Sequence, residues 1–323
     1  MGFYSKRDLT RLLERIEEAG MFPGYKFCKI NDEFLVLGSG MHSIVCKIIC
    51  EKDNKCYALK IMFINHKKES INEYTEAIYL QRRLGKESPY ILKVLDERII
   101  WICFNRNELL DGIFGNIEVY LVLLEELINL SPNSYYTNNN LLLNEKEVLR
   151  FGIQICEALS ILHNEHFLHR DVKLENIYFD KQNNVFKLGD FGCTVNEYDH
   201  SRNVAIYTNG YCPPEIKNMT DNYSVTSEIY SLGICLYLLL NDYKFPASDN
   251  YQVNKVQYSS YFTFPAPINA SAQLARLIRK MCSYSKKNRH QSLNEVQSEL
   301  IKLLQEIKNG EKKNDELKSV YFG

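Results

Sequence analysis

The sequence lacks several features that would each point to a particular class of protein. It has no excess of charge of one sign, because 39 Lys and Arg residues are balanced by 40 Asp and Glu residues and the net charge is −1. A near-neutral chain has no global attraction to nucleic acid or to a membrane surface, so we expect no nucleic-acid partner and only local anion sites. The longest apolar run, Leu232–Leu240, is far shorter than the roughly 20 residues of a membrane span, so none is expected.

The ten cysteines include no C-x-x-C pair, which makes a zinc ribbon or a thioredoxin-like site a weak interpretation. The N-terminus has no apolar segment of the kind that forms a signal peptide. Scattered cysteines without a secretory signal favour a reducing compartment. We therefore expect a cytoplasmic or nuclear protein.

Length and composition indicate a folded chain of about two domains. The 323 residues allow two units of about 150 residues each. Residues 5–20 place Leu9, Leu12, Leu13 and Ile16 at helical spacing, which predicts an amphipathic helix. This apolar stripe either packs on the rest of the protein or binds a partner, and the sequence leaves both open.

The remaining pattern divides the chain into a sheet-rich front half and a helical back half. Short apolar runs over 25–62 predict strands, 69–84 returns to helical spacing, and three further strands are predicted within 90–97, 99–104 and 117–127. The polar segment 131–140 reads as a loop. Beyond it, strongly apolar segments predict buried helices.

Two glycines separate two of the predicted strands. Gly38 and Gly40, with Ser39 between them, would let backbone N–H groups approach a phosphate closely. An ordinary hairpin turn is the alternative. A dinucleotide-binding fingerprint is disfavoured, because a strand rather than a helix follows.

Lys60 lies in a predicted strand and alternates with Ala58, which places both on the face of the glycine loop. A single lysine in a strand is often a solvated edge residue, so this alternative remains. Glu76 lies on the next predicted helix. It would either hold the ammonium group of Lys60 ready for a phosphate or be one more exposed helix charge.

The most specific pattern comes later in the chain. Residues 168–176 read LHRDVKLEN, and DFG follows at 190–192. Asn176 and Asp190 offer the oxygen ligands that Mg²⁺ prefers. Asp171 is suited to orient an attacking hydroxyl and take its proton, and Lys173 can neutralise a moving phosphoryl group. A purely structural explanation is easy for any one of these residues but not for the ordered set.

This ordered set resembles the eukaryotic protein kinase family from about Phe34 to about Leu300. The resemblance implies a bilobal α+β fold, with a small antiparallel-sheet N-lobe at 25–126 that carries one major helix and a larger helical C-lobe at 127–309. A helical extension at 1–24 and a charged tail at 310–323 would flank it. The implied activity is Mg-dependent transfer of the ATP γ-phosphoryl group to a Ser or Thr hydroxyl of a protein substrate.

The resemblance also implies roles for individual residues. Asp171 would be the catalytic base with Lys173 beside it. Lys60 would contact the α/β-phosphates and pair with Glu76, with Glu73 as the second choice. The residues holding the cofactors would be Gly38, Ser39, Gly40, Val45, Ala58, Lys60, Leu124, Glu125, Leu127 and Asn176 for ATP, and Asn176 and Asp190 for Mg²⁺.

Further motifs follow in the order of the family. The hinge would fall at Glu125–Leu127, with Leu124 guarding the back pocket. Residues 211–215 resemble the A-P-E end of an activation segment, and Glu215 is expected to pair with Arg289. Thr208 has the position that meets the catalytic Asp and Lys in Ser/Thr kinases.

Three departures from the family pattern stand out: Ser43 replaces the third loop glycine, Tyr207 replaces a glycine, and Glu228 replaces an Asp that braces the catalytic loop. The extra methylene of Glu228 displaces its carboxylate by about 1.5 Å, which predicts a looser loop. The departures keep a second hypothesis open, a weakly active or inactive pseudokinase that serves as a nucleotide-binding scaffold. A small-molecule kinase is disfavoured by the complete activation segment.

Two further expectations concern regulation and reactivity. Arg170 would bind a phosphate on the activation segment, with Ser201 as the preferred site, unless the segment is ordered already. Cys193 is either a reactive thiol beside the metal site or a small packing residue. The sequence predicts neither the physiological substrate nor the oligomeric state.

Overall fold

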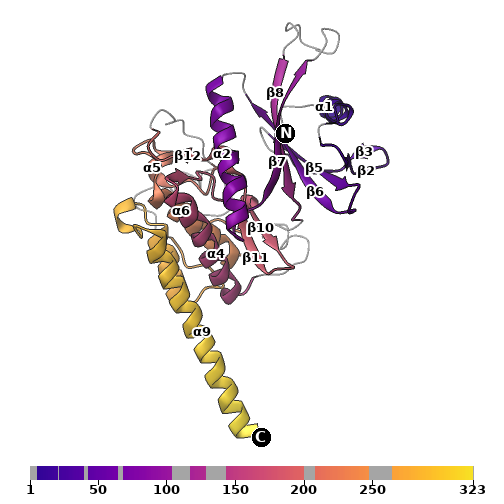
Figure 1. Cartoon of the computed structure of the whole chain (residues 1–323). Coiled ribbons are helices and arrows are strands. Elements are labelled where there is room, and N and C mark those ends of the chain that lie inside the picture. Colours follow the sequence, from indigo (N-terminus) through magenta and orange to yellow (C-terminus); the bar gives the residue numbers. More distant parts are fainter. Residues whose placement is uncertain are drawn as a thin grey trace. The chain divides into compact units, whose positions relative to one another are not determined.

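The computed structural model describes residues 6–20, 22–39, 43–64, 68–103, 117–128, 143–199, 208–246 and 264–322 (Figure 1). The chain divides into two compact units. The first unit comprises Met1–Lys86 and Leu92–Leu127, and the second comprises Glu87–Ile91 and Ile128–Gly323. Each unit has its own architecture.

The first unit is built on an antiparallel sheet with the strand order β1-β5-β6-β8-β7, in which β4 also pairs with β5. Alternation makes these segments strands: in β5, Ile44, Cys46 and Ile48 are buried on one face while the residues between them are partly exposed. A small hairpin, β2–β3, is separate from this sheet. The strands are β1 Tyr25–Phe27, β2 Lys29–Ile30, β3 Glu33–Phe34, β4 Val36–Ser39, β5 Ser43–Cys50, β6 Cys56–Ile64, β7 Val94–Cys103 and β8 Ile117–Glu126.

One strand prediction was wrong. The sequence predicts two strands within 90–97 and 99–104, whereas Val94–Cys103 forms the single strand β7. The charged residues in the middle do not interrupt it, because Arg98 pairs in register with Val122 and its side chain bonds to Asp96 at 3.0 Å. The pairing register shifts between Val94 and Asp96, as at a β-bulge.

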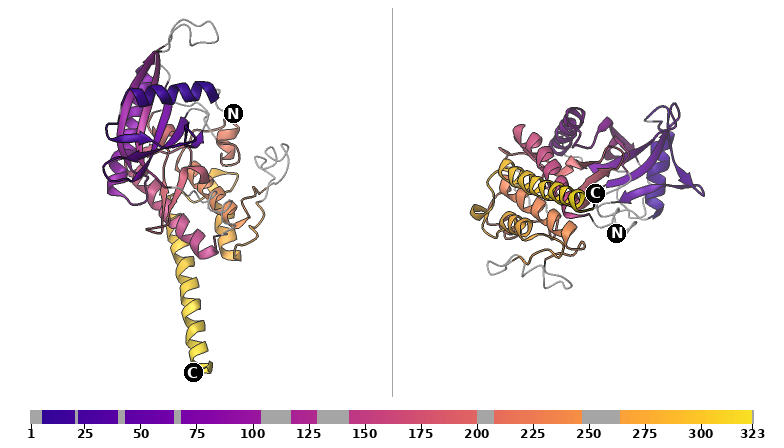
Figure 2. Two further views of the ribbon diagram at one scale, coloured as in Figure 1. Left: turned by 90° about the vertical axis from the view of Figure 1, so that its right-hand side faces the viewer. Right: turned by 90° about the horizontal axis from the view of Figure 1, so that it is seen from below.

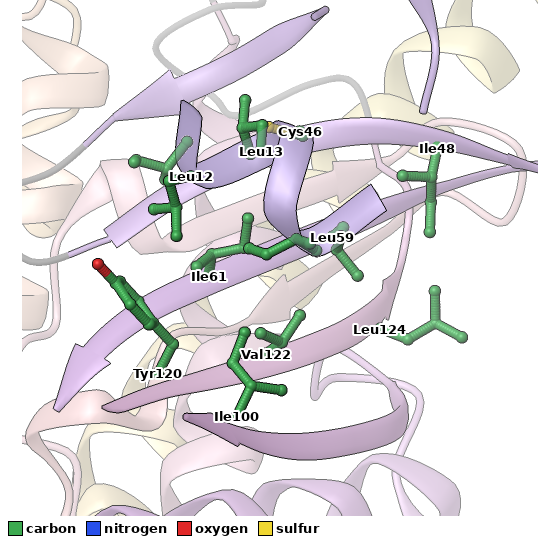
Figure 3. Close-up of a cluster of buried hydrophobic side chains, with 12 residues drawn as sticks. Leu12, Leu13, Cys46, Ile48, Leu59, Ile61, Ile100, Tyr120, Val122 and Leu124 are labelled. Carbon is green, nitrogen blue, oxygen red and sulfur yellow. The ribbon is translucent and has the colours of Figure 1, made fainter. Parts of the chain in front are cut away.

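Helices α1 (Lys6–Glu18) and α2 (Lys68–Glu87) pack on different faces of this sheet. Leu12, Leu13 and Ile16 of α1 are almost fully buried in one cluster with residues of β5, β6 and β8. Figure 3 labels Leu12 and Leu13 among the side chains of this cluster. On the other face, Ile78 of α2 packs with Met62 and other residues of a second cluster. The apolar face of α1 therefore packs within its own unit, which decides between the two alternatives that the sequence left open.

The second unit is mainly helical and is arranged around α6, in which every residue from Thr226 to Leu240 is buried. A helix that is apolar on all sides belongs inside a domain. Helix α4 packs against α9, and Gly152 permits this contact because a Cβ there would lie 2.8 Å from Leu300 Cδ1. The helices are α4 Glu145–Asn164, α5 Pro214–Lys217, α6 Val225–Leu240, α8 Ala272–Met281 and α9 Leu293–Phe322.

Short elements between α4 and α5 carry most of the sequence motifs. The hairpin of β10 (Ile177–Asp180) and β11 (Val185–Leu188) is flanked by the 3-10 turns Leu174–Asn176 and Phe191–Cys193. Strand β9 (Phe167–Leu168) pairs with β12 (Val195–Asn196). These pairings bring the LHRDVKLEN segment and the DFG segment together.

Helix α9 continues to Phe322, through the segment that the sequence analysis treats as a charged tail (Figures 1 and 2). A salt bridge of 2.7 Å between Glu311 and Lys146 of α4 fastens the helix beyond the apolar contact. Among the described residues, no helix is both long and apolar enough to cross a membrane.

Candidate active site

In the first unit, the register of the sheet sets three predicted site positions side by side. Gly38 pairs with Val45, Val45 pairs with Lys60, and Lys60 pairs with Leu123. Directly opposed residues of an antiparallel sheet point to the same face. Gly38, Val45 and Lys60 therefore form one row on one face, and Ala58 shares this face by alternation. Gly40 lies outside the described residues.

Lys60 is buried, with 6% of its surface exposed, on the face of the sheet that α2 covers. Glu76, its predicted partner, is exposed on α2. The side chain of the second candidate, Glu73, lies outside the described residues. The pairing of Lys60 with a carboxylate of α2 stays a prediction.

The prediction for Leu124 needs correction. Leu124 pairs with Leu59, and both belong to the hydrophobic cluster under α1, on the face opposite to Lys60. Because side chains alternate along a strand, the residues of β8 that share the face of Lys60 are Leu123 and Glu125. Leu124 therefore does not share the face of Lys60, whereas Leu123 and Glu125 do.

The end of β8, where the hinge is predicted, is held by the main chain. Glu126 N–H donates to Lys93 O at 3.0 Å, and its carboxylate accepts from Lys93 N–H at 2.8 Å. Glu125 is 4% exposed, and Leu127 is partly buried. Backbone groups at this strand end thus have a fixed position within the first unit.

In the second unit, Asp171 is the centre of a hydrogen-bond network. Its Oδ2 accepts from Lys173 Nζ at 2.6 Å and from Asn176 Nδ2 at 2.8 Å, and its Oδ1 accepts from Thr208 Oγ1 at 2.7 Å. Lys173 Nζ also lies 3.3 Å from Thr208 Oγ1. The predicted meeting of Thr208 with the catalytic Asp and Lys is confirmed.

Asn176 and Asp190 are held close together by the main chain. Gly189 N–H donates to Asn176 O at 2.9 Å, which brings the DFG segment against the catalytic loop. The amide nitrogen of Asn176 donates to Asp171 at the main-chain oxygen and Oδ2, so its Oδ1 is the atom able to ligate a cation. With the carboxylate of Asp190, this is a donor set of hard oxygens that fits Mg²⁺.

Asp190 has a left-handed backbone, with φ 60° and ψ 71°, and its neighbours keep it there. Phe191 is fully buried and packs edge-to-face on His169 at a centroid distance of 5.1 Å. His169 Nε2–H donates to Gly189 O at 3.0 Å, while its Nδ1 accepts from Asp171 N–H at 3.3 Å. One tautomer satisfies both bonds, so His169 joins the catalytic loop to the DFG segment.

Glu228 braces the catalytic loop, and the prediction of a looser loop was wrong. Its Oε1 accepts from Arg170 N–H at 2.8 Å, and its Oε2 lies 2.5 Å from His163 Nε2. The longer side chain is accommodated because His163 on α4 receives the second oxygen. Burial favours a raised pKa for Glu228, but the bonds from His163 and the Arg170 N–H outweigh it and lower the pKa below its usual value.

The predicted pair of Glu215 and Arg289 is confirmed. Arg289 Nη1 and Nη2 donate to the two oxygens of Glu215, each at 2.7 Å, and both residues are buried. Arg289 Nη1 also donates to Thr226 O at 3.1 Å. This fork ties the end of the activation segment to the start of α6.

Cys193 behaves as a packing residue. Burial, followed by the negative charge of Asp171 and Asp190, raises the pKa of its thiol to about 11. A thiol with a raised pKa is protonated at neutral pH and is a poor nucleophile. The binding of a phosphate on the activation segment by Arg170 stays a prediction, because Ser201 and Tyr207 lie outside the described residues.

Sequence reasoning missed two supports of this site. The first is His163, whose contact with Glu228 spans two helices that no local pattern connects. Gly210, at φ +88°, lies under the ring of Phe245, where a Cβ would come within 2.4 Å of the ring. No pattern in the sequence around Gly210 indicates that Phe245, 35 residues later, packs against it.

These two units, a sheet with a buried lysine and a helical unit with an aspartate–lysine–threonine network, have the architecture of a protein kinase fold, which is α+β. Residues 32–301 match the family described as protein kinase domain. The chain therefore belongs to the protein kinase domain family.

Several curated kinases are similar to this chain. A Wee1-like protein kinase of Arabidopsis thaliana is 28% identical over 259 residues, which cover 80% of this chain and 47% of that protein. The cell cycle serine/threonine-protein kinase CDC5/MSD2 of Saccharomyces cerevisiae is 34% identical over 145 residues, covering 44% and 20%. Calcium-dependent protein kinase 4 of Plasmodium berghei is 26% identical over 306 residues, covering 88% and 52%. The chain spans about half of these relatives' lengths or less.

Proposed function

We propose that the chain is a Mg-dependent protein serine/threonine kinase that transfers the γ-phosphoryl group of ATP to a Ser or Thr hydroxyl of a protein. The observation that carries this proposal is the network around Asp171. The hydroxyl of Thr208 donates to Asp171 Oδ1 at 2.7 Å and lies 3.3 Å from Lys173 Nζ. An acceptor hydroxyl needs the same two groups, one to orient it and accept its proton and one to stabilise the transferred charge.

Asp171 is the proposed base, and its neighbours define its role. Lys173 and Asn176 both donate to Oδ2, which fixes the orientation of the carboxylate. Oδ1 is then the oxygen that accepts a hydroxyl proton. Lys173, only partly exposed, carries the positive charge that the phosphoryl group meets as it moves.

Each unit carries residues to which we assign a role in binding the nucleotide. Lys60 binds the α/β-phosphates, Gly38 and Ser39 lie in the loop that covers them, and Val45 and Ala58 pack on the adenine. Asn176 and Asp190 hold Mg²⁺, which neutralises charge on the phosphate oxygens when bound. The main chain of Glu125–Leu127 presents its polar groups to the base.

A nucleotide-binding scaffold without turnover is the second candidate, and the exposed position of Glu76 on α2 is one reason to test it. The unusual Tyr207 remains a second reason to test this alternative.

Radiolabel transfer from ATP and Mg²⁺ to a panel of protein substrates tests the proposal. We expect the wild type to label Ser or Thr and the Lys60→Met variant to lose most turnover, with Lys47→Met as a control on the adjacent strand. Labelling of Tyr alone would contradict the Ser/Thr assignment. Thermal stabilisation by ATP without transfer to any substrate would favour the scaffold.

We propose two wider properties as well. Nine of the ten cysteines are free thiols in the described part of the chain, which suits a reducing compartment such as the cytoplasm or the nucleus. The partners would be ATP and a protein that presents its hydroxyl in an extended segment.

A further inference from the structure

The C-terminal half of α2 is fastened to the beginning of β7 by one arginine. Arg82 Nη1 donates to Glu97 Oε2 at 2.6 Å, and Arg82 Nη2 donates to Leu95 O at 3.0 Å. Asp96 Oδ1 lies 3.7 Å from the same Nη2. The guanidinium fork therefore meets three consecutive residues of the strand, which a single ammonium group could not do.

Two further residues of α2, Gln81 and Gly85, contact the chain just before β7. Gln81 is fully buried, and its Nε2 donates to Leu92 O at 3.2 Å. A Cβ on Gly85 would lie 3.1 Å from Leu92 O and 3.2 Å from Lys93 Cα, so glycine permits the last turns of the helix to approach this closely. Together the contacts line residues 92–97 along one side of α2.

The strand side of this contact is itself fixed. The irregularity in the pairing of β7 falls between Val94 and Asp96, next to the Leu95 carbonyl that Arg82 binds. Asp96 accepts from the Glu97 N–H at 3.0 Å and from Arg98 Nη2 at 3.0 Å. Asp96, the third residue of β7 beside Arg82, is thus held by bonds of its own.

The burial of the pair separates it from an ordinary surface salt bridge. The side chains of Arg82 and Glu97 are 30% and 25% exposed. Exposed ion pairs contribute little, because solvent screens them and both side chains must be ordered. A partly buried guanidinium group that donates to a carboxylate and to a carbonyl fixes the orientation of α2 relative to β7 as well as the distance between them.

We propose that Arg82 is a positioning residue, which sets the rotation of α2 about its own axis and thereby places the helix carboxylate that holds Lys60. The inference rests on the proposed kinase function. Helix α2 covers the face of the sheet on which Lys60 lies, through the packing of Ile78 on Met62 and Ile64. Both candidate carboxylates, Glu73 and Glu76, precede Arg82 on this helix, so a turn of the helix moves them across that face.

The test compares Arg82→Gln with Lys86→Gln, which removes the same charge from an exposed residue of the same helix. We expect kcat of Arg82→Gln to fall by at least about tenfold and that of Lys86→Gln to stay within about twofold of wild type. Arg82→Lys, which keeps the charge but loses the fork, should have an intermediate kcat. A kcat of Arg82→Gln equal to that of Lys86→Gln would overturn the proposal.

Hydrogen exchange supplies a readout that does not depend on turnover. In Arg82→Gln we expect faster exchange of the α2 amides and unchanged exchange in α1, β5 and β6, because only the fastening of α2 is lost. If the wild type has no kinase activity, the proposed function fails, and this measurement still decides the role of Arg82. Unchanged exchange throughout α2 would overturn it.

Discussion

The carboxylate of Glu228 joins the main-chain N–H of Arg170 to the ring of His163, with one oxygen 2.8 Å from the nitrogen of Arg170 and the other 2.5 Å from His163 Nε2. Glu228 is fully buried on α6, and Arg170 precedes the proposed base in the chain. The catalytic loop is therefore held to the most buried helix of the second unit by a single side chain.

Removal of this brace is expected to destabilise the second unit. Glu228→Ala leaves the Arg170 N–H and the His163 ring without their acceptor, and breaking a buried pair costs about 3–5 kcal/mol of unfolding free energy. Glu228→Asp should lose less, because the shorter side chain can still reach one of the two partners. Urea unfolding followed by circular dichroism measures both. Equal stability of Glu228→Ala and wild type would contradict the brace.

Arg289→Ala is expected to be among the most damaging substitutions in the second unit. It leaves the carboxylate of Glu215 buried without its bidentate partner, at a cost of about 3–5 kcal/mol of unfolding free energy. Lys287→Ala, two residues away and exposed, is the matched control and should change the unfolding free energy by less than about 0.5 kcal/mol. A similar urea midpoint for the two variants would be inconsistent with the pair observed here.

Helix α1 is expected to be an integral part of the first unit. Leu12 is fully buried against the sheet, so Leu12→Ala should cost about 2–5 kcal/mol of unfolding free energy. Glu14→Ala, on the exposed side of the same helix, should be nearly neutral. The single tryptophan, Trp101, lies on β7 and reports unfolding of this unit by fluorescence. If both variants unfolded alike, α1 would be a detachable segment.

The stability of the second unit is expected to fall on mild acidification because of His290. Burial, assisted by the nearby charge of Lys280, lowers the pKa of His290 below its ordinary value of 6.5, against the opposing effect of Glu299 and Glu295. The unfolded chain then binds a proton that the folded chain does not, so stability is lost as the pH falls below about 6.5.

The slope of that loss is at most about 1.4 kcal/mol per pH unit for one group. His290→Asn should flatten the dependence of the urea midpoint on pH between about 7.5 and 5.5, whatever it does to the midpoint itself. An unchanged slope in this variant would assign the effect to other groups.

The sequence predicted those parts of the site that ordered motifs define. The contact of Thr208 with Asp171 and Lys173 followed from the motif order, as did the pair of Glu215 and Arg289, although 74 positions separate these two residues. Such contacts are predictable because a motif specifies both partners and their roles without reference to the intervening chain.

What could not be predicted depends on single-residue geometry. Neighbouring residues of a strand point to opposite faces of the sheet. Leu124 therefore packs under α1, whereas Leu123 lies on the face of Lys60. The reach of Glu228 depended on a histidine from another helix. Charged residues at 96–98 looked like a break between strands, yet their mutual bonds and the contact with Arg82 let β7 continue.

The most direct test of the account measures the rate of phosphoryl transfer in a single turnover with ATP and Mg²⁺. If Asp171 is the base, Asp171→Asn should transfer at least about 100-fold more slowly than wild type. Its affinity for ATP should change by less than about threefold, because Asp171 is not one of the proposed metal ligands. Transfer by Asp171→Asn at the wild-type rate, or the absence of transfer by both proteins, would contradict it.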